Sequence, residues 1–133
     1  MRGTTFLCLV LLLASRGSLP AVTLPPGFVA QEVGSSGTCE EIVGLDIAPG
    51  GRLFVIEKRG RAHIVEDNVK LPVPFLDMED EVLNNGDRGL LGIALDPRFS
   101  ENGHVYLLYT VDPDGDGVDD GIPAFSRLTR YTA

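Results

Sequence analysis

Two stretches of the sequence share one pattern: residues 45–58 read LDIAPGGRLFVIEK, and residues 93–110 read IALDPRFSENGHVYLLYT. Each has an apolar run that ends at a proline, then a turn containing glycine, then a second apolar run with an aromatic residue near its start. Pro49 and Pro97 lie 48 residues apart. The two stretches therefore predict two copies of one antiparallel hairpin.

The flanking sequence continues this rhythm of short apolar runs and turn residues. The expected strands are residues 28–33, 42–48, 52–58 and 61–66, and a further strand begins at 127–133. The expected turns are residues 49–51, 59–60 and 67–68. Residues 77–85 are acidic and polar, which indicates a loop with at most one helical turn. Short strands with a turn about every ten residues predict an all-β protein.

A period of this length with about four strands in each unit is typical of a β-propeller, although two similar hairpins in a β-sandwich would give the same pattern. Strands that are apolar on both faces suit blades that are covered on both sides. We therefore expect two blade-like sheets. The expected buried positions are Leu45, Ile47, Phe54, Ile56, Leu91, Ile93, Leu95, Tyr106 and Leu108.

The first residues have the features of a secretory signal peptide. Arg2 precedes the apolar run FLCLVLLLA at 6–14, which is too short to span a bilayer, and small residues follow it. An uncleaved membrane anchor is the alternative. We expect a signal peptide at 1–17, an extended segment at 18–27 and a partial propeller at 28–133. The mature protein would be secreted or periplasmic, with no stable membrane span.

Cleavage after the signal peptide would remove Cys8 and leave Cys39 as the one cysteine of the mature chain. Cys39 could then be a thiol, part of an intermolecular disulfide, or half of a bridge whose partner lies elsewhere. A propeller closes with about four to eight blades, more than 133 residues can supply. The sequence therefore predicts the N-terminal piece of a longer protein.

Composition excludes one class of partner. The net charge is −8, and the basic residues do not cluster. Nucleic-acid-binding proteins usually show a basic patch, so we expect no nucleic acid.

Three segments carry a resemblance to a known family. They are LPPGFVAQEV at 24–33, GLDIAPGGRLFVIEKRGRAHIVEDN at 44–68, and GDRGLLGIALDPRFSENGHVYLLYT at 86–110. The pattern G-L-L-G-x-A-x-x-P-x-F at 89–99 is the most specific part. The chain resembles the glucose/sorbosone dehydrogenase family, which includes soluble quinoprotein sugar dehydrogenases and Hedgehog-interacting proteins. The resemblance implies a six-bladed β-propeller.

In the sugar dehydrogenases of this family, pyrroloquinoline quinone accepts hydride while a histidine removes the sugar hydroxyl proton. The resemblance places that histidine, the basic quinone ligands and the cofactor calcium in later blades, and neither His63 nor His104 matches the catalytic position. Asp87 stands where those enzymes carry a glutamine near the reaction centre, so it is the one candidate catalytic residue. An ionised carboxylate only accepts hydrogen bonds, whereas an amide also donates them. Asp87 could instead cap its own turn, with Arg88 paired to a nearby carboxylate.

The stretch DPDGDGVDDG at 112–121 places five aspartates within nine residues. It resembles the start of an EF-hand loop and the aspartate-rich calcium repeats of thrombospondins. Alternate residues in a tight loop direct carboxylates at one centre, and calcium prefers such oxygen ligands. However, Pro123 stands where an EF-hand has its bidentate glutamate, and a solvated acidic hairpin is the alternative. The expected metal ligands are Asp112, Asp114, Asp116, the Val118 carbonyl, Asp119 and Asp120.

Two functions remain open from the sequence. The chain could be the N-terminal part of a secreted sugar-dehydrogenase-like propeller whose parent protein oxidises an aldose or related alcohol with pyrroloquinoline quinone. Alternatively, it could belong to a non-enzymatic, calcium-stabilised extracellular propeller that binds a protein or a glycan. The close family pattern favours the first, and Asp87 in place of glutamine favours the second.

Overall fold

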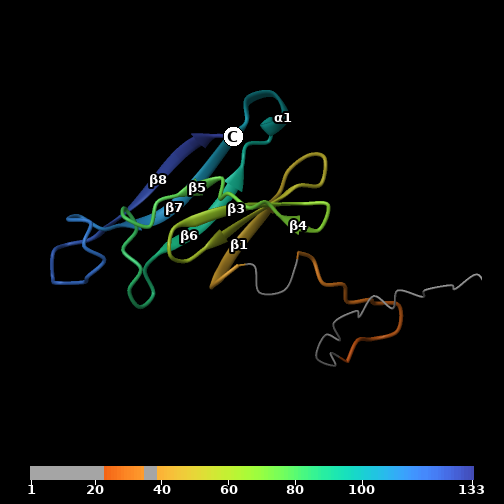
Figure 1. Cartoon of the computed structure of the whole chain (residues 1–133), viewed down its shortest axis with the longest axis horizontal. Helices are drawn as coiled ribbons and strands as arrows, with labels where there is room; N and C mark the ends of the chain where they lie inside the picture. Colours follow the sequence, from red (N-terminus) through yellow and green to blue (C-terminus); the bar gives the residue numbers. More distant parts are fainter. Residues whose placement is uncertain (1–22, 35–38) are drawn as a thin grey trace, which may run out of the picture. The chain divides into compact units, whose positions relative to one another are not determined.

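The computed structural model describes residues 23–34 and 39–133 (Figure 1). It divides into two units, Met1–Glu32 and Val33–Ala133. The proposed signal peptide at 1–17 lies outside the described residues. The strand expected at 28–33 is wrong, because these residues are exposed and pair with no other described strand. Among the described residues, no helix is long and apolar enough to cross a membrane.

The first sheet is antiparallel and follows the chain in the order β1-β2-β3-β4. Its strands are β1 (Ile42–Ile47), β2 (Leu53–Glu57), β3 (Arg61–Glu66) and β4 (Val69–Lys70), and β5 (Leu76–Asp77) also pairs with β3. Asp67 and Asn68 both have positive φ, as the tight two-residue turn between β3 and β4 requires. The strands predicted at 42–48, 52–58 and 61–66 are confirmed.

The second sheet has the order β6-β7-β8 and is also antiparallel. Its strands are β6 (Leu90–Leu95), β7 (His104–Val111) and β8 (Phe125–Thr132), so the strand expected near the end of the chain is confirmed. A single helical turn, α1 (Phe99–Asn102), connects β6 to β7. We did not expect α1, because four residues are too few to show helical periodicity.

The two hairpins repeat in structure as they do in sequence. β1 has a register shift between Ile42 and Gly44 against β2, and β6 has one between Leu90 and Gly92 against β7. The two bulges are 48 residues apart, which is the spacing of the two prolines. β1 and β6 pack against each other, and Asp46 in β1 accepts a hydrogen bond from the Leu95 N–H of β6 at 2.7 Å. The equivalent strands of the repeat therefore lie side by side.

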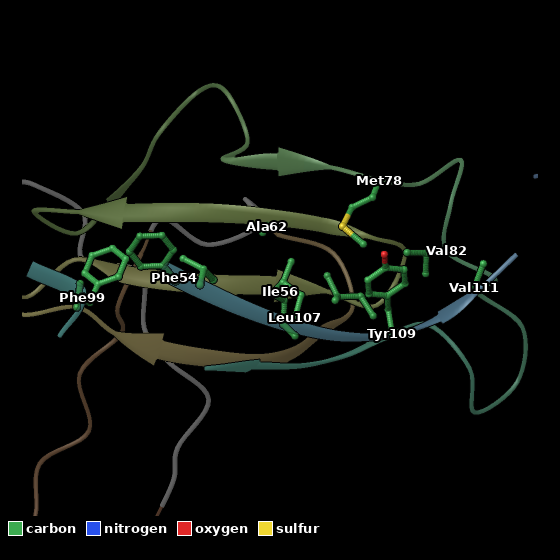
Figure 2. Close-up of a cluster of buried hydrophobic side chains, with 12 residues drawn as sticks. Phe54, Ile56, Ala62, Met78, Val82, Phe99, Leu107, Tyr109 and Val111 are labelled. Atoms are coloured by element: carbon green, nitrogen blue, oxygen red, sulfur yellow. The ribbon is translucent and has the colours of Figure 1, made fainter. Parts of the chain in front are cut away.

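The core lies between the two sheets, and both contribute side chains to it (Figure 2). Phe54 is fully buried and meets Phe75 and Phe99 edge-on, with ring centroids 5.6 and 5.4 Å apart. The buried cluster consists of Ala48, Phe54, Ile56, Ala62, Met78, Val82, Leu90, Phe99, Val105, Leu107, Tyr109 and Val111.

The predicted burial was correct for Phe54 and Ile56, and Ile93 and Leu95 are partly buried against the core. It was wrong for Leu45, Ile47, Leu91 and Leu108, which are 42–58% exposed. Tyr106 is half-buried. In β7, Val105, Leu107, Tyr109 and Val111 enter the core, so Tyr106 and Leu108 between them lie on the other face of the sheet. Because β7 is apolar at both sets of positions, its sequence did not indicate which face packs inward.

Backbone hydrogen bonds gather three loops at one end of the two sheets. The Met78 N–H donates to the Gly60 carbonyl at 3.1 Å, and the Asp112 N–H donates to the Glu81 carbonyl at 2.9 Å. We call residues 58–60, 77–89 and 112–124 the acidic end, because aspartate and glutamate outnumber lysine and arginine there. The acidic end contains Asp87 and the whole aspartate-rich loop.

Candidate functional site at the acidic end

Asp87 lies on a turn that is held by Lys58, the residue that follows β2. The Arg88 N–H donates to the Asn85 carbonyl at 3.0 Å, and the Lys58 ammonium donates to the Gly86 carbonyl at 2.7 Å. The side chain of Asp87 is exposed and makes no hydrogen bond or ion pair with the described residues. Arg88 pairs with Asp119, as the alternative interpretation of this turn expected, but Asp87 does not cap the turn. Asp87 is therefore available to solvent and to ligands.

Gly89, the first residue of the G-L-L-G pattern, lies where the two sheets meet. The Leu90 N–H donates to the Lys58 carbonyl at 2.8 Å, and the Gly89 carbonyl accepts from the Thr110 N–H at 2.9 Å. Gly89 has φ +142°, and a Cβ at this position would lie 2.6 Å from the Lys58 carbonyl oxygen. The glycine allows this close approach of backbone to backbone.

Three of the predicted metal ligands come together. Asp112, Asp114 and Asp116 each offer a carboxylate oxygen, and these oxygens lie within 4.8 Å of one another. Asp112 is buried at the end of β7, whereas Asp114 and Asp116 are exposed. The Gly117 N–H donates to Asp112 Oδ2 at 2.7 Å, and the Val118 N–H donates to Asp116 Oδ1 at 2.8 Å. These bonds fold the loop so that three negative charges face one another.

The clustering perturbs the acidity of two of these carboxyl groups in opposite directions. The hydrogen bond from the Gly117 N–H lowers the pKa of Asp112 below its usual value. Desolvation by the surrounding loop, with the neighbouring Asp112, Asp116 and Asp120, raises the pKa of Asp114. Ionisation of Asp114 is thus less favourable than that of an isolated aspartate, and a nearby positive charge would offset this effect.

The other three predicted ligands have different partners. The Val118 carbonyl accepts from the Asp120 N–H at 3.2 Å, and Asp120 Oδ1 accepts from the Ile122 N–H at 3.1 Å. Asp119 forms the ion pair with Arg88. This ion pair ties the aspartate-rich loop to the turn that carries Asp87.

The arginines near the acidic end face carboxylates. Arg61 lies 3.1 Å from Asp77 and 2.8 Å from Glu79, and Arg59 lies 3.6 Å from Glu40. Arg88 pairs with Asp119, and Arg127 pairs with Glu81. These guanidinium groups are already occupied within the chain.

Two groups of interacting side chains near the acidic end were not predicted from the sequence. Glu81 accepts a hydrogen bond from the Tyr109 hydroxyl at 2.8 Å, beside Arg127 and Tyr131. His63 and Glu57 are both buried on the first sheet, with His63 Nε2 3.2 Å from Glu57 Oε1. Neither ring nitrogen of His63 makes a hydrogen bond with the described residues. Glu81 and Tyr109 are 28 positions apart, and Glu57 and His63 lie on two strands that meet only because β2 pairs with β3, so a one-dimensional pattern does not reveal either group.

The phenol of Tyr131 should titrate at high pH, and its absorbance makes this titration measurable. Burial, together with Tyr109 and Glu81 nearby, raises its pKa from 10.0 to about 12. Because the folded state favours the neutral phenol, its stabilising contribution is complete below about pH 10 and is lost as the pH rises through about 12. We expect Tyr131→Phe to remove the phenolate absorbance step near pH 12. Tyr106→Phe is the control and should keep that step; a step that survives in Tyr131→Phe would contradict the prediction.

Two packed antiparallel sheets with a repeated bulged hairpin define a propeller-like all-β protein. Residues 39–128 match the Glucose / Sorbosone dehydrogenase family, and the chain belongs to this family.

Hedgehog-interacting proteins are among the relatives in sequence. The human protein is 34% identical over 93 residues, which cover 65% of this chain and 13% of that protein. The mouse protein is 37% identical over 68 residues, covering 47% of this chain and 10% of that protein. The chain thus spans only a small part of the curated relatives that it matches.

Solved structures give the same fold. A putative oxidoreductase (glucose dehydrogenase) from Thermus thermophilus is 26% identical with a TM-score of 0.55, over 74% of this chain and 25% of that one. The form of aldose sugar dehydrogenase from Streptomyces coelicolor with bound pyrroloquinoline quinone has a TM-score of 0.56, over 74% of this chain and 26% of that one. At 24% identity, the second likeness concerns the fold alone.

Proposed function

We propose that this chain forms the first blades of a secreted, six-bladed, calcium-stabilised propeller that binds a protein partner and carries out no redox chemistry. The observation that carries the proposal is the charge of the acidic end, where carboxylates are in excess and the arginines already have carboxylate partners. Such a surface suits a partner with a basic surface, which it would attract by long-range electrostatics.

The arginines of the acidic end do not themselves offer a site for the quinone. Pyrroloquinoline quinone is a tricarboxylate, so a site for it requires cationic side chains that are not neutralised by the protein's own acids. The described arginines of the acidic end face carboxylates, and Asp112, Asp114 and Asp116 would repel the anion. By resemblance, the quinone ligands of the enzymes correspond to no residue of this chain.

The second candidate is sugar oxidation by a longer protein that contains this chain. The family match and the glucose dehydrogenase neighbour from Thermus thermophilus favour it. In this candidate Asp87 would lie near the reaction centre, at the position of the family glutamine, and other parts of the protein would supply the histidine and hold the quinone. The substrate would be an aldose or a related alcohol.

One pair of assays distinguishes the two candidates. We expect neither the 133-residue chain nor the longer protein, mixed with pyrroloquinoline quinone, calcium and a panel of aldoses, to reduce a dye above the rate with cofactor alone. We also expect the longer protein to bind purified Hedgehog protein, the probe suggested by the names of its relatives, in surface plasmon resonance, with an association rate that falls as salt is added. Steady sugar-dependent dye reduction by the longer protein would overturn the proposal in favour of the enzyme.

A further inference from the structure

The aspartate-rich loop has an uncompensated charge. Of its five aspartates, Asp119 alone has a cationic partner among the described residues. The arginines around the acidic end face other carboxylates, so they are not free to neutralise Asp112, Asp114 or Asp116. Three facing carboxylates therefore depend on solvent or on a bound cation.

Asp112 points to a cation rather than to solvent. Asp112 is only 6% exposed, so water screens the charge of its carboxylate poorly. Oδ2 accepts the hydrogen bond from Gly117, but Oδ1 is buried and accepts no hydrogen bond from the described residues. A buried carboxylate oxygen without a partner is costly, and a metal ion in contact with it would remove this cost.

The spacing of the oxygens is compatible with calcium, and exposed, flexible carboxylates suit calcium better than magnesium, which requires near-ideal octahedral geometry and dehydrates reluctantly. Calcium–oxygen bonds are about 2.3–2.6 Å long, so two ligands of one calcium ion can be up to about 5 Å apart. Magnesium–oxygen bonds are about 2.0–2.1 Å long, so two of its ligands cannot be more than about 4.2 Å apart. The oxygens of Asp112, Asp114 and Asp116 lie within 4.8 Å of one another, a limit that fits around calcium without rearrangement.

We propose that Asp112, Asp114 and Asp116 bind one calcium ion, with Oδ1 of Asp112 as the buried ligand and water completing the coordination. This ligand set is smaller than the sequence suggests, because Asp119 pairs with Arg88 and Asp120 bonds the backbone of its own loop. The site gives a structural basis to the calcium in the proposed function, but it does not depend on which partner the protein binds.

Calorimetric titration of the purified chain with calcium chloride tests the site. We expect saturable binding of one ion with a dissociation constant of about 10⁻⁴–10⁻³ M, the range of extracellular calcium modules, and at least tenfold weaker binding of magnesium. The double variant Asp114→Ala/Asp116→Ala should bind calcium at least tenfold more weakly. Both residues are exposed, so the variant should keep its fold, which circular dichroism can verify.

Two more variants separate a site from a diffuse charge effect. Asp112→Asn should also bind at least tenfold more weakly, whereas Asp120→Asn, with the same loss of charge in the same loop, should bind within about twofold of the wild type. Calcium should raise the melting temperature of the wild type and leave that of the double variant unchanged. Absence of saturable heat at millimolar calcium, equal binding by the double variant, or an equal loss in Asp120→Asn would overturn the proposal. None of these results depends on sugar oxidation or on Hedgehog binding.

Discussion

Replacing Phe54 with alanine should lower the free energy of unfolding by about 3–5 kcal/mol, the range for removing a buried aromatic ring. Phe54 is 0% exposed and packs edge-on against Phe75 and Phe99, which come from the segment before β5 and from α1. Its loss would leave a cavity between segments that are distant in the sequence. Urea unfolding followed by circular dichroism measures the effect.

Phe28→Ala is the matched control for this measurement. Phe28 is 70% exposed, so its replacement should change the free energy of unfolding by no more than about 0.5 kcal/mol. Equal effects of the two substitutions would show that the ring of Phe54 is not a central part of the core.

Gly89→Ala should lower the free energy of unfolding at least as much as most substitutions in the core do. A non-glycine residue forced into this sparsely populated backbone region costs about 1–3 kcal/mol, and overpacking costs about 1–3 kcal/mol more. Here the added Cβ would lie 2.6 Å from the Lys58 carbonyl oxygen, which is backbone and cannot move without breaking its bond to Leu90. We therefore expect a loss of about 2–6 kcal/mol in the free energy of unfolding.

Gly51→Ala separates backbone strain from the clash. Gly51 also has positive φ, +90°, but no atom lies within 4 Å of the position its Cβ would take. This variant should show only the strain, about 1–3 kcal/mol. If both variants lose the same stability, the close approach of Lys58 does not explain why glycine occurs at the start of the G-L-L-G pattern.

The sequence was sufficient to locate most strands, because turn residues separate them. Pro49, Gly50 and Gly51 mark the end of β1, and Asp67 and Asn68 mark the turn between β3 and β4. It was not sufficient to choose the buried face of β7, which is apolar on both sides. In β1 the bulge beside Val43 adds a residue, and such an insertion changes which positions face inward without leaving a clear mark in the sequence.

The remaining errors in the predicted fold concern residues whose structure depends on partners far away in the sequence. Residues 28–33 contain enough apolar side chains for a strand, but a strand also requires a neighbouring strand with which to bond, and none is described for them. Conversely, Asp46 stands out as an acid within an apolar run, and its acceptor role for Leu95 depends on a residue 49 positions away.

The sequence indicated which carboxylates of the aspartate-rich loop come together, but not which residues pair with the others. Alternating aspartates placed Asp112, Asp114 and Asp116 together, because local loop geometry controls them. The ion pair that withdraws Asp119 from the group depends on Arg88, which reaches the loop only through the packing of β6 beside β7. The position of Asp87 on an exposed turn likewise follows from the tertiary contact between Lys58 and Gly86.

The backbone junction at Lys58 has a consequence for local unfolding. The Lys58 N–H bonds the Glu41 carbonyl at the start of the first sheet, while its carbonyl bonds the Leu90 N–H at the start of the second. Opening either sheet at this end would therefore break hydrogen bonds of the other and expose their shared core. The two sheets should thus behave as one cooperative foldon, in which the slowest-exchanging amides of both are released in the same rare event.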